Sequence, residues 1–298
     1  MDLALSRLRI PAGNAGCAQT EGLCPDNEAF ERLVSELAIV TAPPVTTPAH
    51  THGLRGFALN VHHTTTTISA NSLYWQRGSQ GSAADVQQDL NSNPPPVLMW
   101  TRLELRKGLP LGFEVAADAG HGFGTSMWEV TGRLKLALVE GFHTGAGQLP
   151  DISLEATSQA LVGISDMSLF TQGVHLTLSK PYAVFGRAQV APLAAVQFLY
   201  VSAVSDPVDL AAGVAQNACK DNPSACDPGL NTVVRFSSVT QGRVRWVLGL
   251  DVAVELLHGI VTAAFEAPTA AMRDMGTAYG GRRVAGQFAL TAGLGLQF

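Results

Sequence analysis

The chain has 298 residues, of which 46% are hydrophobic and only 14% are charged, and its formal net charge is −5. Globular proteins usually carry about 25% charged residues. The sequence has no basic cluster, so we expect no nucleic-acid partner. It also has no run of about 18 consecutive apolar residues, which excludes a transmembrane helix. Few charges without a long apolar run are typical of membrane barrels, in which apolar residues alternate along strands.

Residues 1–52 differ in pattern from the rest of the chain. The stretch 1–11 lacks the basic and apolar regions of a signal peptide, so for an exported protein we expect the numbering to start on the mature chain. Apolar residues at helical spacing predict a short amphipathic helix over 26–42. Three prolines then predict a stiff, extended link up to residue 52. This segment either lies on the periplasmic side or enters the following domain as a plug.

The four cysteines form two pairs that each close a short loop, Cys17 with Cys24 and Cys219 with Cys226. Both pairs lie in polar segments, so we expect two local disulfides and an oxidising compartment. The alternative is four free thiols. Zinc is not expected, because the spacing of a zinc site is missing.

From residue 53 to residue 298 we expect one all-β domain. Apolar and polar residues alternate with a period of two, which predicts about ten strands. Tight turns are expected at Lys107–Gly108 and at His258–Gly259. The expected strands are 54–69, 97–106, 109–118, 127–140, 152–162, 169–180, 189–203, 243–256, 260–267 and 284–298.

The polar row of these strands mixes small residues with charges of both signs. A soluble sandwich tends to carry a densely charged outer face, whereas a narrow lumen needs small residues and paired charges. We therefore interpret the charges as lining a lumen that is closed or nearly closed. The expected lumen charges are Arg102, Glu104, Arg106, Glu114, Asp118, Glu129, Arg133, Lys135, Arg243, Arg245, Asp251 and Glu255.

The connections between the ten expected strands alternate in length. With both termini on the periplasmic side, the three long connections all fall outside, and short turns fall inside. An open strand edge is not tolerated in lipid, so the last strand must close on the first. The fold class expected is therefore a transmembrane antiparallel up-and-down β-barrel of about ten strands.

The last stretch, GQFALTAGLGLQF, ends the chain on Phe298. This alternating strand with a terminal aromatic residue resembles the C-terminal strand of Gram-negative outer-membrane β-barrel proteins, and the resemblance covers roughly 54–298. It implies an outer-membrane location, lipid contacts, and recognition of Phe298 as an assembly signal by the barrel-insertion machinery. The stretch LTLSKPYAVFG also resembles porin-like barrels of myxobacteria.

The motifs of known barrel hydrolases are missing. Barrel lipases carry an H-x-S pair, whereas Ser179 follows His175 by four residues, about 13 Å along a strand. The D-x-H pair of barrel proteases does not occur. His50, His52, His62 and His63 form a conceivable metal cluster, but His62 and His63 point to opposite faces of a strand, so no metal and no cofactor are expected.

The sequence thus favours a non-enzymatic barrel with a structural or scaffold role, which binds envelope proteins through residues 1–52 or the external loops. A small porin-like channel is the alternative, and a hydrolase is a remote one. Sugar binding by Tyr74 and Trp75 in the first long loop is a further hypothesis.

Overall fold

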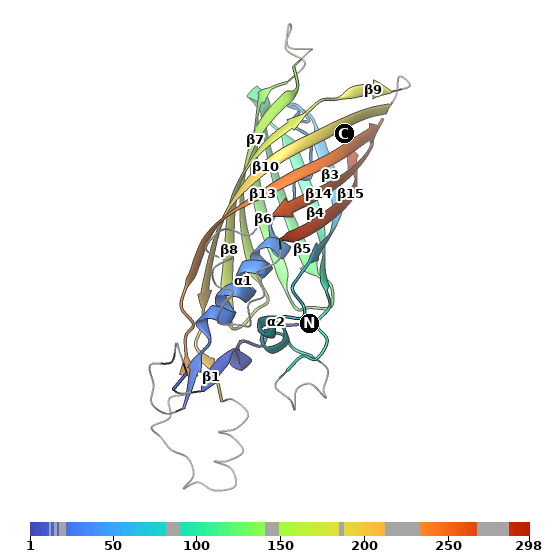
Figure 1. Cartoon of the computed structure of the whole chain (residues 1–298). Helices are drawn as coiled ribbons and strands as arrows, with labels where there is room; N and C mark the ends of the chain where they lie inside the picture. The colour runs from blue at the N-terminus through green and yellow to red at the C-terminus, as the bar shows by residue number, and fades with distance from the viewer. Residues whose placement is uncertain are drawn as a thin grey trace.

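Ten antiparallel strands close into a barrel (Figure 1). The computed structural model describes the chain except residues 12, 15–16, 18–21, 82–89, 141–148, 185–187, 212–232 and 267–285. The number of strands and their up-and-down order confirm the predicted fold class. The barrel strands are β3 (Phe57–Thr67), β4 (Val97–Gly108), β5 (Phe113–Gly122), β6 (Trp128–Val139), β7 (Asp151–Val162), β8 (Met167–Ser179), β10 (Ala188–Ser205), β13 (Val239–Val254), β14 (Leu257–Glu266) and β15 (Gln287–Gln297).

Two pairings close the ring. β15 pairs with β3 from Ala289–Thr66 to Gln297–Ala58, and β10 pairs with β13 along nearly its whole length. At the end of the chain, the Phe298 nitrogen donates to the Phe57 oxygen at 2.8 Å, and the Phe57 nitrogen donates to the Phe298 oxygen at 3.0 Å. The stretch that ends the sequence therefore seals the barrel, as its alternating pattern predicts.

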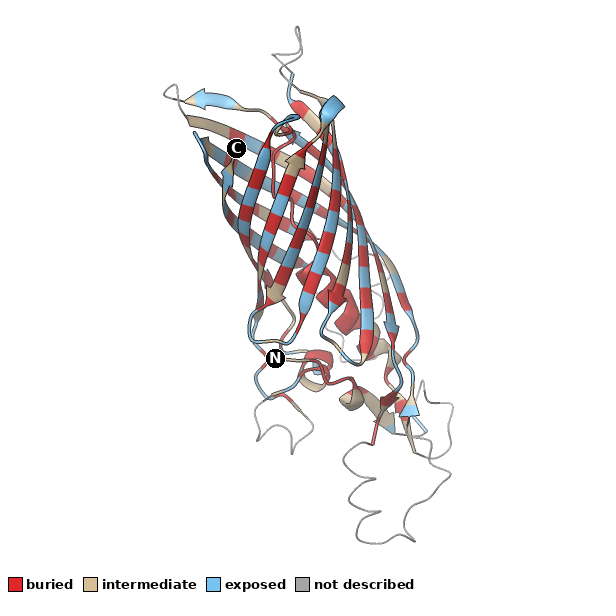
Figure 2. Ribbon diagram, turned by 180° about the vertical axis from the view of Figure 1, so that it is seen from behind, coloured by how far each residue is buried: buried red, intermediate tan, exposed pale blue. Residues whose placement is uncertain are grey.

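Buried and exposed residues alternate along most of each barrel strand, as the red and pale blue bands of Figure 2 show. The exposed rows are mostly large apolar residues, for example Leu103 on β4 and Val130 on β6. A soluble monomer rarely exposes an apolar patch of more than a few hundred Å², whereas here apolar residues predominate over the outer wall of the barrel. That outer surface suits lipid. Among the described helices, none has the length and apolar content needed to span a bilayer.

The two ends of the barrel differ. β3, β10 and β14 end at one mouth of the barrel, where the connections 68–96, 206–238 and 267–286 emerge; we call this the long-loop end. It also holds α2 (Leu73–Gly78), β11 (Val208–Asp209) and β12 (Val233–Val234). The opposite mouth, the short-turn end, holds the C-terminus, η2 (Pro110–Gly112) and β9 (Tyr182–Val184), which pairs with the first residues of β10.

Both tight turns lie a few residues away from their predicted positions. Lys107 and Gly108 still belong to β4, and the chain reverses over η2, where Leu111 and Gly112 have positive φ angles of 63° and 74°. His258 and Gly259 belong to β14 and pair with Ala253 and Val252 of β13. The turn before β14 is formed by Glu255, at a φ of 53°, and the next residue. Glu255 is exposed in this turn, so its prediction as a lumen charge is wrong.

The N-terminal elements are η1 (Leu5–Arg7), β1 (Arg9–Pro11), β2 (Leu23–Pro25) and the helix α1 (Asn27–Thr41). The first residues contact the long-loop end: the Ser126 nitrogen donates to the Asp2 carboxylate at 2.6 Å, and the Ala4 nitrogen donates to the Gly78 oxygen at 2.9 Å. In Figure 1 the N- and C-terminal marks lie at opposite ends of the barrel. Two expectations from the sequence, external long loops and a periplasmic residue 1, therefore exclude each other.

We expect deletion of Phe298 to impair assembly, because it removes the two main-chain hydrogen bonds with Phe57 that end the seam between β15 and β3. The measurement is the heat-modifiable gel shift of membrane fractions, with Phe298→Tyr as the control that keeps an aromatic end. Equal folded fractions for the deletion and the full chain would contradict this role of Phe298.

Candidate functional site

The lumen of the barrel is occupied by the chain itself. We call residues 26–52 the inner segment; it consists of α1 followed by extended chain. Figure 1 shows α1 inside the barrel, and nearly all residues from Ala29 to Ala49 are buried. The Asp26 side chain caps α1 by accepting a hydrogen bond from the Ala29 nitrogen at 3.0 Å. Because the wall surrounds α1, its polar residues as well as its apolar residues are buried.

An apolar cluster holds α1 in the half of the lumen nearest the long-loop end. Phe30, Leu33 and Leu37 of the helix are fully buried against inward residues of the wall. The rings of Phe30 and Phe236 stack with centroids 4.7 Å apart. The cluster includes Trp100 of β4 and Met127. This half of the lumen is therefore packed like the core of a soluble protein.

A cluster of paired wall charges lies in the other half of the lumen. Arg106 contacts Glu104 at 2.8 Å, Glu114 at 2.9 Å and Glu155 at 3.1 Å. Arginine can serve three carboxylates at once because its planar guanidinium carries five N–H donors. Arg106 is thus the centre of a buried cluster of carboxylates from β4, β5 and β7.

Other predicted lumen charges form further buried pairs. Arg133 contacts Asp118 at 2.7 Å and Glu155 at 3.2 Å. Buried charges are tolerated only when they are paired and hydrogen-bonded, and these pairs satisfy that condition. Further buried ion pairs include Arg102 with Glu129 and Arg243 with Glu266, and the His258 ring contacts Asp251.

Cationic and amide side chains of the wall also bind main-chain oxygens of the inner segment. Arg102 donates to the Thr41 oxygen at 3.0 Å, and Arg133 donates to the Pro44 oxygen at 2.8 Å. Arg245 and Gln197 share the Pro43 oxygen at 2.9 and 2.8 Å.

Nearer the short-turn end, Lys135 reaches the oxygens of Pro48 at 2.6 Å and His50 at 2.7 Å. Proline has no N–H, so a proline-rich extended chain presents mainly acceptors. The wall presents matching donors at successive levels.

Three N–H groups of the extended part find acceptors on the wall. The Ala49 nitrogen donates to the Ser179 hydroxyl at 2.8 Å, and the Thr51 nitrogen donates to Glu140 at 2.7 Å. The His52 nitrogen donates to Glu114 at 3.1 Å. The inner segment is therefore bound through its main chain on both its donor and its acceptor side.

Glu36 of α1 links the inner segment to the first long connection. Its carboxylate accepts hydrogen bonds from the Ser69 nitrogen at 2.9 Å, the Tyr74 hydroxyl at 2.7 Å and the Trp75 indole nitrogen at 2.6 Å. The Tyr74 and Trp75 side chains are buried, and Ser69 is half-buried. Burial, reinforced by the charge of Glu36, raises the pKa of the Tyr74 hydroxyl, which keeps it a donor. Since Tyr74 and Trp75 are buried here, the hypothesis that they bind a sugar at the surface is wrong.

Sequence reasoning placed most of the wall charges but missed some of their partners. Glu155 and Glu266 are buried partners of arginines, and Gln159 and Gln197 bind carbonyl oxygens of the inner segment. Each stands on the polar row of its strand, so the period-two pattern contains the signal that points them inward. Nothing in that pattern identifies Glu36 as a site residue, because its donors come from a distant loop.

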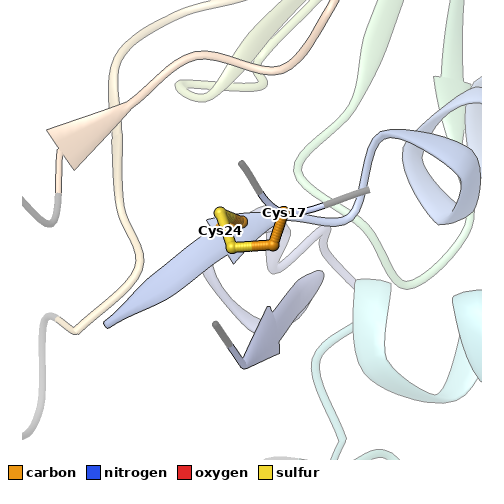
Figure 3. Close-up of a disulfide and its surroundings, with 2 residues drawn as sticks. All are labelled: Cys17 and Cys24. Atoms are coloured by element: carbon orange, nitrogen blue, oxygen red, sulfur yellow. A yellow bond between two sulfur atoms is a disulfide. The ribbon is translucent and has the colours of Figure 1, made fainter. Parts of the chain in front are cut away.

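His62 and His63 of β3 face opposite sides of the barrel wall. His62 faces the lumen and lies 3.3 Å from Glu104, whereas His63 contacts Thr101 on the outer side, as their adjacency predicts. Within the described residues, no group of three or more potential ligands is placed to hold a metal ion. Cys17 and Cys24 form the predicted disulfide (Figure 3). Cys219 and Cys226 lie outside the described residues.

No family model and no curated protein matches the chain. Solved structures with a similar fold include the attachment invasion locus protein Ail of Yersinia pestis (7% identity, TM-score 0.28, 82% of this chain and 99% of that one) and Neisserial surface protein A (10%, 0.28, 82% and 96%). Another is the transport unit of the autotransporter AIDA-I from Escherichia coli (6%, 0.32, 91% and 98%). Sequence identities and TM-scores this low carry no argument about function. None of these structures supports the resemblance to myxobacterial porin-like barrels.

We expect Glu36→Ala to lower the free energy of unfolding by about 3 kcal/mol, because it leaves buried donors of Ser69, Tyr74 and Trp75 without an acceptor. The matched control is Glu31→Ala on the same helix, where the side chain is half-buried. The measurement is the midpoint of unfolding followed by tryptophan fluorescence and gel shift. Equal midpoints for the two variants would contradict the role of Glu36.

We expect Arg106→Met to be more damaging, by about 3–5 kcal/mol, because it leaves Glu104, Glu114 and Glu155 buried without their shared cation. Lys107→Met, the neighbouring residue on the outer row, is the control. The folded fraction after refolding in detergent gives the comparison. A refolding yield for Arg106→Met as high as that of the control would show that the carboxylates do not need this arginine.

Proposed function

We propose that this chain is an integral outer-membrane β-barrel of a Gram-negative bacterium with a structural, non-enzymatic role, closed to solutes at rest. The observation that carries the proposal is the inner segment, which fills the lumen from the long-loop end to the short-turn end. The apolar outer wall and the sealed seam between β15 and β3 support a location in lipid.

A channel needs a continuous row of water along its axis and side chains that are free to meet a solute. Here the guanidinium groups of Arg102, Arg133 and Arg245 are engaged by main-chain oxygens of the inner segment. The carboxylates of the wall are paired as well; for example, Glu129 forms an ion pair with Arg102. For solutes to pass, the inner segment would have to leave the barrel and expose these charges. The filled lumen therefore favours the structural role over a small porin-like channel.

The contacts of His175 and Ser179, the described candidates for a hydrolytic role, give that role no support. The Ser179 hydroxyl accepts a hydrogen bond from the Ala49 nitrogen. The His175 ring is hydrogen-bonded to Gln197, and its Nδ1 lies 3.8 Å from the Glu155 carboxylate. Both side chains are buried. Each is thus explained by its contacts within the filled lumen, without a catalytic role.

A structural barrel acts through the surfaces it offers to partners. The inner segment is enclosed, so the part of the N-terminal region that can meet other envelope proteins is residues 1–25, together with the long connections. The barrel-insertion machinery is the second partner class that we propose, and it would recognise the strand that ends in Phe298.

We expect the full chain, reconstituted in planar bilayers, to give no unitary current steps, because its lumen is filled. A porin reconstituted from the same detergent is the positive control, and the heat-modifiable gel shift verifies that the protein is folded. Regular unitary current steps from the folded full chain would contradict the closed structural role and establish a channel.

A further inference from the structure

The inner segment runs through the barrel in one direction. Along β6, which passes from the long-loop end at Trp128 to the short-turn end at Val139, Arg133 binds the oxygen of Pro44, and Lys135 then binds those of Pro48 and His50. Later residues of the inner segment thus meet wall residues nearer the short-turn end. The chain leaves the lumen there and begins β3 beside Phe298.

Residues ahead of the inner segment lie at the opposite mouth. We call residues 1–11 the strap. Leu3 forms a bridge with Ser79 of the first long connection, and the Asp26 nitrogen donates to the Leu8 oxygen at 2.9 Å. Arg9 donates to the oxygen of Leu210, which follows β10. The strap therefore joins connections that follow β3, β5 and β10 and forms one surface with them.

The long-loop end is the outer end in bacterial barrels, whose periplasmic connections are short. The disulfide between Cys17 and Cys24 lies in the stretch that joins the strap to α1, and disulfides persist in oxidising compartments, including the cell surface. Neither observation depends on the other, and both fit an external position of residues 1–25.

We propose that the chain enters its own barrel from the cell surface, so that the strap and the described parts of the long connections form one external face. This inference rests on the proposed outer-membrane location. It makes the inner segment an anchor: whatever is attached ahead of Asp26 is displayed outside the cell. Partners that dock on residues 1–25 are then extracellular, and a periplasmic partner meets only the short-turn end.

The threading also constrains assembly. α1 is packed by side chains on all sides, and its cluster includes residues from both β4 and β13. The inner segment must therefore be in position when β15 pairs with β3, or must pass through the lumen before α1 packs.

The test inserts one short epitope at three exposed sites of the full chain and probes intact cells with the antibody. The sites are between Gly13 and Asn14 in the N-terminal region, between Phe123 and Gly124 at the long-loop end, and after Glu255 at the short-turn end. The gel shift verifies that each insertion variant folds, and each is probed again after permeabilisation of the outer membrane.

We expect the first two epitopes to bind antibody on intact cells, and the third to bind only after permeabilisation. If the epitope at Gly13 needs permeabilisation while that at Phe123 does not, the external position of residues 1–25 is wrong. If only the epitope after Glu255 is reached on intact cells, the direction of threading across the membrane is reversed. Current steps in bilayers would overturn the closed lumen without changing this pattern, so the two proposals fail separately.

Discussion

The interaction on which the structure depends is the binding of main-chain oxygens of the inner segment by cations of the barrel wall. A guanidinium or ammonium group taken out of water loses several kcal/mol of solvation unless new partners replace the water. Carboxylates of the wall replace part of it, and the oxygens of Thr41, Pro43, Pro44, Pro48 and His50 supply further partners. The donors of the wall and the main-chain acceptors of the inner segment therefore satisfy one another's hydrogen bonds.

The prolines of the inner segment contribute to this match in two ways. They hold the chain extended, so that successive oxygens reach successive levels of the wall, and they remove N–H groups that would need acceptors. Among the residues between them and β3, Ala49 and Thr51 do have N–H groups, and Ser179 and Glu140 accept these. A lumen with this complementarity has the character of a protein core, which is why we favour a structural role over conduction.

A second anchor acts at the other end of the inner segment. Glu36 ties α1 to α2 and to the start of the first long connection, while the apolar residues of α1 fill the barrel beside it. The helix is thus fixed both by packing and by a buried carboxylate with three neutral donors. This fixation keeps the strap at the long-loop end.

The sequence by itself determined the barrel. A strict period of two makes one row of each strand apolar and the other polar, and unpaired strand edges are excluded in lipid, so alternation over ten strands leaves closure as the solution. The same period placed eleven of the twelve expected lumen charges correctly and failed at Glu255, because a tight turn ends the alternation there.

Only the tertiary structure decided what fills the lumen. The helix over 26–42 and the prolines after it are visible in the sequence, but local pattern is the same for a segment beside a barrel and for one inside it. The choice depends on contacts between distant residues, such as Arg133 with Pro44 or Glu36 with Trp75. The end of the barrel at which residue 1 lies is decided by the same long-range contacts, which periodicity does not encode.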